Sequence, residues 1–217
     1  MLEPTALEQL PLFPLPGLVF FPPTLLPLHM FEPRYRELAA WCIANRSPLA
    51  VVRIQAGSES EQLGNPPVAP VAGVGKLIFH EKLPDGRYNI LLRGVARVRL
   101  VEELDRDLGF RMARAEIVSD EFPADRVGLE RKTRSLKKYV TNLIPQWPQA
   151  ARLLGRILER HAAPAELADY LASVLFQDPG DRQELLECVR VEERLDRVQE
   201  RVIHLLADTV SPGNTIQ

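Results

Sequence analysis

The sequence predicts an α+β protein, in which a small β-barrel with one short helix is followed by a C-terminal bundle of helices. Residues 71–118 alternate between apolar and polar side chains, as strands do, whereas apolar residues recur at helical spacing after residue 125. At 217 residues the chain can bury a full core. The change of pattern places a β-barrel subdomain at 1–121 and a helical subdomain at 122–217.

The composition is that of an ordinary soluble protein. Hydrophobic residues make up 46%, charged residues 26%, and the formal net charge is -2. These values place the chain away from disordered, strongly nucleic-acid-binding and integral membrane classes. Its two cysteines, Cys42 and Cys188, are too few for a disulfide framework and favour a cytoplasmic, reducing location.

Residues 10–35, LPLFPLPGLVFFPPTLLPLHMFEPRY, combine closely spaced prolines with large apolar side chains. No Lys or Arg precedes Arg34, which argues against a secretory signal, and prolines break every apolar run before it reaches membrane-spanning length. Proline lacks an amide proton, so it excludes a helix and restricts strands to edges, ends and bulges. An exposed polyproline ligand would leave too much apolar surface in water. We therefore expect short extended pieces of folded structure.

The next segments predict a helix, a strand and a loop. Residues 31–45 show helical spacing, and Pro33 suits a first-turn position. Residues 48–54 are apolar and β-branched, as in a short strand, whereas 56–67 are rich in polar residues, Gly and Pro. We expect an exposed loop there.

Residues 71–104 predict a long β-hairpin that turns at Pro84-Asp85-Gly86. Alternation in its second strand predicts a core face and a wet face. The core face comprises Ile90, Leu92, Gly94, Ala96, Val98 and Leu100, and the wet face comprises Arg93, Val95, Arg97 and Arg99. A further strand over 110–118 would let the sheet curl into a barrel.

Apolar stripes predict the helices of the C-terminal part. The stripes are Leu129, Leu136, Val140 and Leu143; Leu153, Leu154, Ile157 and Leu158; and Leu167, Leu171, Val174 and Leu175. The third helix can begin at Pro164, and Asp181 with Glu184 resembles a capping box. The last helix carries a heptad-like seam at Val191, Leu195, Val198, Val202 and Leu205. This seam could pack inside one chain or pair two chains in a homodimer.

The proline spacing of LPLFPLPGLVFFPPTLLPLHMFEPRYREL resembles the start of the Lon N-terminal domain, the substrate-recognition domain that precedes the ATPase in Lon proteases. The blocks GVGKLIFHEKLPDGRYNILLRGVARVRL, FRMARAEIV and ELADYLASVLF resemble its later parts, so the likeness covers nearly the whole chain. It implies a PUA-like barrel followed by helices, related in fold to part of cereblon. Because the sequence ends where the ATPase would follow, we expect a standalone Lon-domain protein.

No catalytic motif emerges from the sequence. Gly75-Lys76 is the nearest approach to a P-loop, but it lacks the first glycine and the hydroxyl residue. No GxSxG occurs, and Ser135 near Lys137 and Lys138 lies on a charged helix. The four histidines lack metal-ligand spacing. These histidines are His29, His80, His161 and His204. We therefore expect a non-enzymatic protein without cofactor or metal.

Two basic features keep RNA binding open as an alternative. Residues 131–138, RKTRSLKK, carry five basic side chains, and Arg93, Arg97 and Arg99 share one sheet face. A solvated helix face explains the first, and charges that discourage edge pairing explain the second. Nucleic acid is therefore the second choice as a partner.

Recognition of unfolded or extended polypeptide is the leading hypothesis, because it requires apolar surface or open strand edges rather than a catalytic set. The candidate groove residues are Phe20, Phe21, Leu28, Met30 and Phe31. The alternative is that these side chains fill the barrel core. A separate protease or chaperone is an expected collaborator, and a membrane is not.

Overall fold

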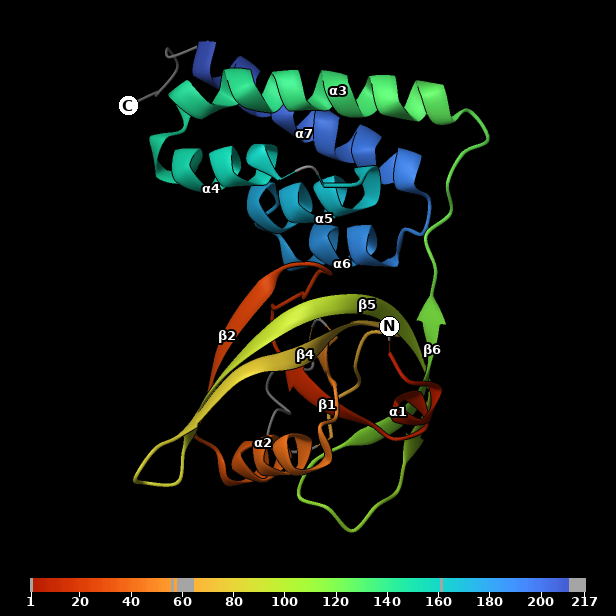
Figure 1. The fold of residues 1–217 in the computed structure, drawn as a ribbon, viewed down its shortest axis with the longest axis vertical. Coiled ribbons are helices and arrows are strands. Elements are labelled where there is room, and N and C mark those ends of the chain that lie inside the picture. The colour runs from red at the N-terminus through yellow and green to blue at the C-terminus, as the bar shows by residue number, and fades with distance from the viewer. Residues whose placement is uncertain (1, 56, 58–64, 161, 211–217) are drawn as a thin grey trace. The chain divides into compact units, whose positions relative to one another are not determined.

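The computed structural model describes residues 2–55, 57, 65–160 and 162–210, and confirms the predicted α+β class (Figure 1). Its elements are α1 (Pro4–Glu8), β1 (Leu10–Leu15), β2 (Leu25–Met30), α2 (Pro33–Asn45), β3 (Leu49–Arg53), β4 (Val71–Lys82), β5 (Tyr88–Leu104), β6 (Met112–Val118), α3 (Arg126–Leu143), the short 3-10 turn η2 (Ile144–Gln146), α4 (Pro148–Glu159), α5 (Pro164–Leu175), α6 (Pro179–Glu187) and α7 (Val191–Val210). Most of the predicted loop at 56–67 lies outside the described residues.

The described chain forms two compact units. The first contains the residues up to Ser119 together with Asp178–Glu187, and the second contains the remaining helices. Helix α6 thus belongs with the sheet. That 1–121 and 122–217 are separate domains stays a prediction.

Six strands form one mixed sheet in the order β2-β5-β4-β3-β1-β6. A further pairing between β5 and β6 closes five of the strands into a barrel. Strand β2 lies outside this ring, because among the residues with described structure it pairs with the first part of β5 alone, from Leu25 opposite Arg93 to Met30 opposite Tyr88. The sheet therefore has a closed part and an open part.

Strand β1 carries two prolines although it is an interior strand. It pairs with β6 at Leu10 and Pro11, and with β3 from Leu12 onward. The amide of Leu12 donates to Arg111 O on the β6 side at 2.9 Å, so alternation places the nitrogen of Pro14 on that side too, beyond the paired stretch. Proline is tolerated because the missing donor falls where no ladder bond is made.

The segment between β1 and β2 crosses close over the sheet, and glycines make room for it. A Cβ added at Gly73 would lie 1.8 Å from Phe20 O, and one at Gly94 would lie 2.6 Å from Phe21 O. Because the obstacles are backbone atoms, side-chain movement cannot relieve these clashes. The two glycines therefore allow Phe20 and Phe21 to enter the core.

The hairpin and helix α2 are as predicted. Strands β4 and β5 turn at Pro84-Asp85-Gly86, where Gly86 has φ +84 and Leu83 N donates to Arg87 O at 2.8 Å. Helix α2 begins at Pro33 and ends at Asn45. It covers one apolar cluster, which includes Phe13, Leu38 and Leu92.

A second apolar cluster lies on the opposite faces of β1 and β3 and includes Leu12, Val52 and Val98. Helix α1, which the sequence did not predict, contributes Leu7 to it. Strands β1 and β3 therefore have core on both faces.

Helix α6 packs on the sheet and buries Arg97, which was predicted to lie on the wet face. The side chain of Gln183 donates to Val71 O at 2.9 Å, and Arg97 Nε donates to Leu186 O at 2.9 Å. Arg97 is only 4% exposed, so its expected place on a wet face is wrong. The helix is capped by Asp178, which accepts from Asp181 N at 2.9 Å, and not by Asp181 itself.

In the second unit, α3, α4, α5 and α7 form a bundle, and α5 begins at Pro164 as predicted. The α7 seam is buried inside the chain at Val191, Leu195, Val198 and Val202. It is therefore not available for pairing two chains in this conformation.

A buried arginine ties this unit together. Arg194, on α7, is 1% exposed and forms ion pairs with Asp120 at 2.8 Å and Asp169 at 3.4 Å. It also donates to Cys188 O at 2.8 Å. Two carboxylates and a carbonyl compensate for the burial of its charge.

Candidate functional site

The structure separates the five residues predicted to line a peptide groove. Phe20, Phe21 and Met30 are buried in the first unit, so they offer no surface to a partner in this conformation. Leu28 is half-buried against the core, and Phe31 is 60% exposed. For the three buried residues the alternative reading, that they fill the core, is the one the structure shows.

Strand β2 presents an open edge. Among the described residues it pairs with β5 alone. Thr24 O accepts from Gly94 N at 2.9 Å, which fixes the side of the strand that faces β5. Successive residues of a strand point their backbone N–H and C=O groups to alternate sides. The backbone polar groups of Leu25, Pro27 and His29 therefore point away from β5. Proline lacks a donor, so the edge offers three carbonyls and two amides.

The side chains of Leu25, Pro27 and His29 lie on one face of the sheet. Together with their partners on β5 and β4 they form three rows. The register aligns Leu25 with Arg93 and Lys76, Pro27 with Leu91 and Phe79, and His29 with Asn89 and Glu81. We call these nine residues the outer face. Phe79 is 55% exposed and Leu25 is 53% exposed. An apolar row thus lies between a cationic row and a polar row.

Hydrogen bonds confirm that the third row lies on one face. His29 Nδ1 and Asn89 Oδ1 are 2.7 Å apart, and Asn89 Nδ2 donates to Glu81 Oε2 at 3.1 Å. Arg87 Nη1 lies 3.2 Å from His29 Nε2, and Phe31 stacks beside the same ring with centroids 6.3 Å apart. These contacts hold the polar row in place next to the open edge.

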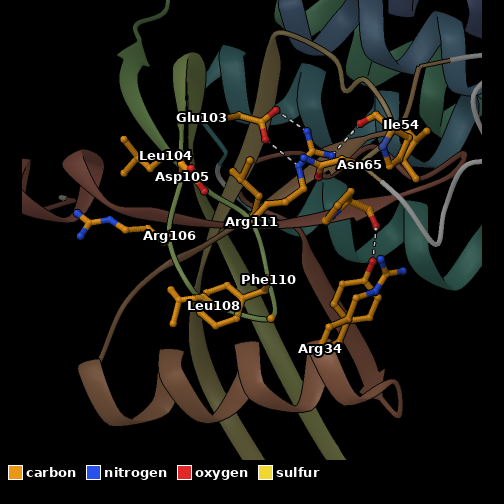
Figure 2. A pocket seen from close by; sticks show the side chains of 15 residues that line it. Arg34, Ile54, Asn65, Glu103, Leu104, Asp105, Arg106, Leu108, Phe110 and Arg111 are labelled. Atoms are coloured by element: carbon orange, nitrogen blue, oxygen red, sulfur yellow. Dashed lines mark hydrogen bonds and ion pairs between the residues drawn. The ribbon is translucent and has the colours of Figure 1, made fainter.

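A cavity of about 500 Å³ lies elsewhere in the first unit (Figure 2). Its walls come from β1, the start of α2, the end of β5 and residues 105–111. It adjoins Pro14, where β1 lacks a partner on the β6 side.

Several polar groups that line this cavity contact one another. Arg111 Nε donates to Glu103 at 2.8 Å and Arg111 Nη1 donates to Pro66 O at 2.8 Å. The Tyr35 hydroxyl lies 3.4 Å from Pro14 O, and the Arg34 guanidinium lies 4.5 Å from the Tyr35 ring centroid (Figure 2). Burial raises the pKa of Tyr35. These contacts stabilise the loop at 105–111, and the described residues that line the cavity include no Ser, Thr or Cys.

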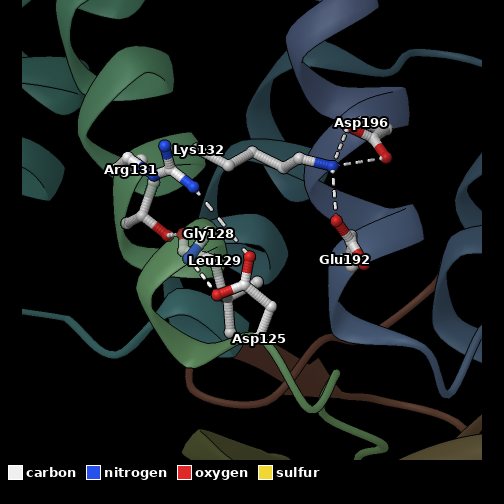
Figure 3. Close-up of polar contacts among 8 residues, drawn as sticks. Asp125, Gly128, Leu129, Arg131, Lys132, Glu192 and Asp196 are labelled. Atoms are coloured by element: carbon white, nitrogen blue, oxygen red, sulfur yellow. Dashed lines mark hydrogen bonds and ion pairs between the residues drawn. The ribbon is translucent and has the colours of Figure 1, made fainter.

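The two basic features hold fewer exposed charges than the sequence suggested. Arg93 and Arg99 are exposed, but Arg97 is engaged by α6. On α3, Lys132 Nζ bonds Glu192 at 2.9 Å and Asp196 at 2.8 Å, and Arg131 lies 3.9 Å from Asp125 (Figure 3). Burial alone would lower the pKa of Lys132. Hydrogen bonds to Asp196 and Glu192 outweigh this effect, so the pKa of Lys132 is raised above its ordinary value.

Three residues weighed for chemistry in the sequence, Cys42, Lys76 and His80, line one pocket of about 350 Å³ in the first unit. Cys42 is buried, and burial raises the pKa of its thiol to about 12, so it carries little thiolate. Lys76 lies in β4, as a strand residue. Within the described ranges no cluster of three His, Cys, Asp or Glu side chains could hold a metal ion, and His161 lies outside those ranges. None of the described helices has the length and hydrophobicity needed to cross a membrane.

The fold defines a class of protein: an α+β protein with a small barrel and a short helix, followed by a helical region. Residues 9–204 match the family described as the ATP-dependent protease La (LON) substrate-binding domain. The chain belongs to this family, and the resemblance noted in the proline-rich segment is confirmed.

Whole Lon proteases are among the relatives. The chain is 28% identical to a Lon protease of Anaeromyxobacter dehalogenans and 29% identical to one of Paraburkholderia phytofirmans, covering 88% and 90% of this chain. It spans 22% and 24% of those relatives, about a quarter of their length.

Solved structures share the fold. The N-terminal domain of a Mycobacterium avium complex Lon protease superposes with a TM-score of 0.70 at 16% identity, covering 90% of this chain and 98% of that one. A Lon N-terminal domain protein from Xanthomonas campestris gives 0.62 at 24% identity, covering 89% and 98%. At these identities the likeness concerns the fold alone.

Proposed function

We propose that this protein is a non-enzymatic recognition module that binds unfolded or extended polypeptide at the open edge of β2. The observation that carries the proposal is that, in the part of the chain that the structure describes, β2 pairs on one side only and adjoins exposed apolar side chains. An extended chain can add to such an edge through main-chain hydrogen bonds, while neighbouring side chains supply apolar contact. The family description, a substrate-binding domain, supports this proposal.

The exposed apolar side chains are placed where such a chain would lie. Leu25 is on β2 itself, Phe31 follows the end of the strand, and Phe79 lies in the same apolar row as Pro27. An exposed apolar patch next to an unpaired edge is costly for a protein that has no use for it. Recognition gives these residues a role that core packing does not.

An array of short peptides derived from an unfolded protein, probed with the purified chain, tests this proposal. We expect binding to apolar segments and about a tenfold loss when both Leu25 and Phe31 are changed to Glu, because two apolar contacts are removed. Val127→Glu is the matched control, since Val127 is 65% exposed on α3 in the other unit. Absence of binding to any peptide would contradict the proposal.

RNA binding is the weaker alternative, because Arg97 is engaged and Lys132 and Arg131 have carboxylate neighbours. Association with a separate protease or chaperone and a cytoplasmic location remain predictions. Salt-dependent binding to RNA, lost in the Arg93→Ala and Arg99→Ala variants, would favour the alternative.

A further inference from the structure

We propose that the ligand adds to β2 as an antiparallel strand in one register, with an apolar residue opposite Pro27 and, two positions later in the peptide, an acidic residue opposite Leu25. This inference rests on the proposed function and adds to it the orientation and chemistry of the bound peptide. It follows from three features of the open edge.

The first feature is the spacing of the donors. Leu25 and His29 can each exchange two hydrogen bonds with an opposing residue, whereas Pro27 can only accept one through its carbonyl. A peptide in this register therefore points three amides toward β2, at the residues opposite His29, Pro27 and Leu25. The amides between them point to solvent.

The second feature is the apolar row. Residues directly opposite one another in antiparallel strands place their side chains on the same face. The peptide residue opposite Pro27 therefore extends the row formed by Pro27, Leu91 and Phe79. An apolar side chain there shields Pro27 from water, and a charged one would interrupt the row.

The third feature is charge. Leu25 lies opposite Arg93, which lies opposite Lys76, and all three are exposed. An added strand places its residue about 10 Å from Arg93, two strand spacings away. Extended arginine and glutamate side chains together span that distance across Leu25, with their aliphatic stems over its side chain. The cationic row thus complements an acidic residue.

The probe is the fluorescein-labelled peptide Thr-Thr-Thr-Phe-Thr-Glu-Thr, with anisotropy measured on the full chain. We expect N-methylation of Phe or of Glu to weaken binding about tenfold, because each change removes a main-chain bond and adds a methyl at the edge. N-methylation of the Thr between them should leave binding unchanged, since that amide faces solvent.

Charge reversal tests the register. Arg93→Glu should weaken binding about fivefold and favour the peptide in which Lys replaces Glu. Arg99→Glu, on the same strand but beyond the stretch paired with β2, should have no effect. Circular dichroism checks that both variants fold.

Equal binding of all N-methylated peptides, or equal effects of the two arginine variants, would overturn the proposed register. In that case binding to the peptide array would still stand, so the register can fail without the proposed function. Failure of the array and of this probe together would overturn both.

Discussion

Strands β3 and β2 belong to the same sheet, but they are used in opposite ways. β3 pairs with β1 and β4, and Leu49, Ala50, Val51 and Val52 are all buried. Within the described ranges β2 pairs with β5 alone, and its residues alternate between exposed and partly buried up to Met30, which is buried. A strand with core on both faces and partners on both edges stabilises the fold, whereas one with a free face and edge can bind. The following experiments test that contrast.

The largest expected effect is that of Gly73→Ala. A Cβ there would lie 1.8 Å from the backbone oxygen of Phe20, so strand β4 or the crossing segment must move. We expect a loss of about 4 kcal/mol in the free energy of unfolding of the first unit, measured by urea titration. Gly155→Ala is the control, because open space surrounds this helical position and alanine should stabilise it by about 1 kcal/mol. Equal stability of the two variants would contradict the close crossing.

The next effect compares the two faces of the open part. Leu92→Ala removes a fully buried side chain and should cost about 3 kcal/mol. Leu25→Ala changes a side chain that is 53% exposed and should alter stability by less than about 0.5 kcal/mol, while weakening peptide binding. Thermal unfolding of both variants measures the difference in stability. A large loss of stability in Leu25→Ala would mean that this residue is part of the core.

A smaller effect distinguishes the two arginines that lie two positions apart on β5. Arg97→Ala leaves Leu186 O without its donor and should cost about 2 kcal/mol, whereas Arg99→Ala should be nearly neutral. Chemical denaturation is again the measurement. Similar small values for both variants would show that α6 does not depend on Arg97.

The smallest effect concerns thiol chemistry. Burial raises the pKa of Cys42 to about 12, and burial with the charge of Glu193 raises that of Cys188. A thiol whose pKa is higher in the folded than in the unfolded chain stabilises the folded state. This stabilisation is fully present at a pH below the unfolded-state pKa and is lost as the pH rises through the folded-state pKa. A thiol reagent at pH 8 should therefore label half-buried Cys188 slowly and Cys42 only after unfolding. Rapid labelling of Cys42 in the folded chain would contradict its burial.

Local signals made much of the fold predictable. Pro33 marks the start of α2, Pro164 that of α5, and Pro84-Asp85-Gly86 the hairpin turn, because each depends on residues close in sequence. The parallel pairing of β1 with β3 and the closure of β5 on β6 depend on contacts distant in sequence. Alternation alone does not contain that information.

The site was less predictable for the same reason. Alternation correctly identified Leu92 as a core residue, but it could not show that α6 covers Arg97. The apolar character of Phe20 and Phe21 was visible, yet their burial depends on glycines some fifty and seventy residues away in the sequence. The prolines did restrict strands to edges, ends and bulges, but they did not distinguish β2, an edge strand with Pro27, from β1, an interior strand with Pro11 and Pro14.

The most direct test of the central claim is amide hydrogen exchange of the full chain with and without the phenylalanine–glutamate peptide. The open-edge account predicts that the amides of Leu25 and His29 exchange more slowly when the peptide is bound, because both become hydrogen-bond donors to it. Unchanged exchange at these two amides in a chain saturated with peptide would contradict it.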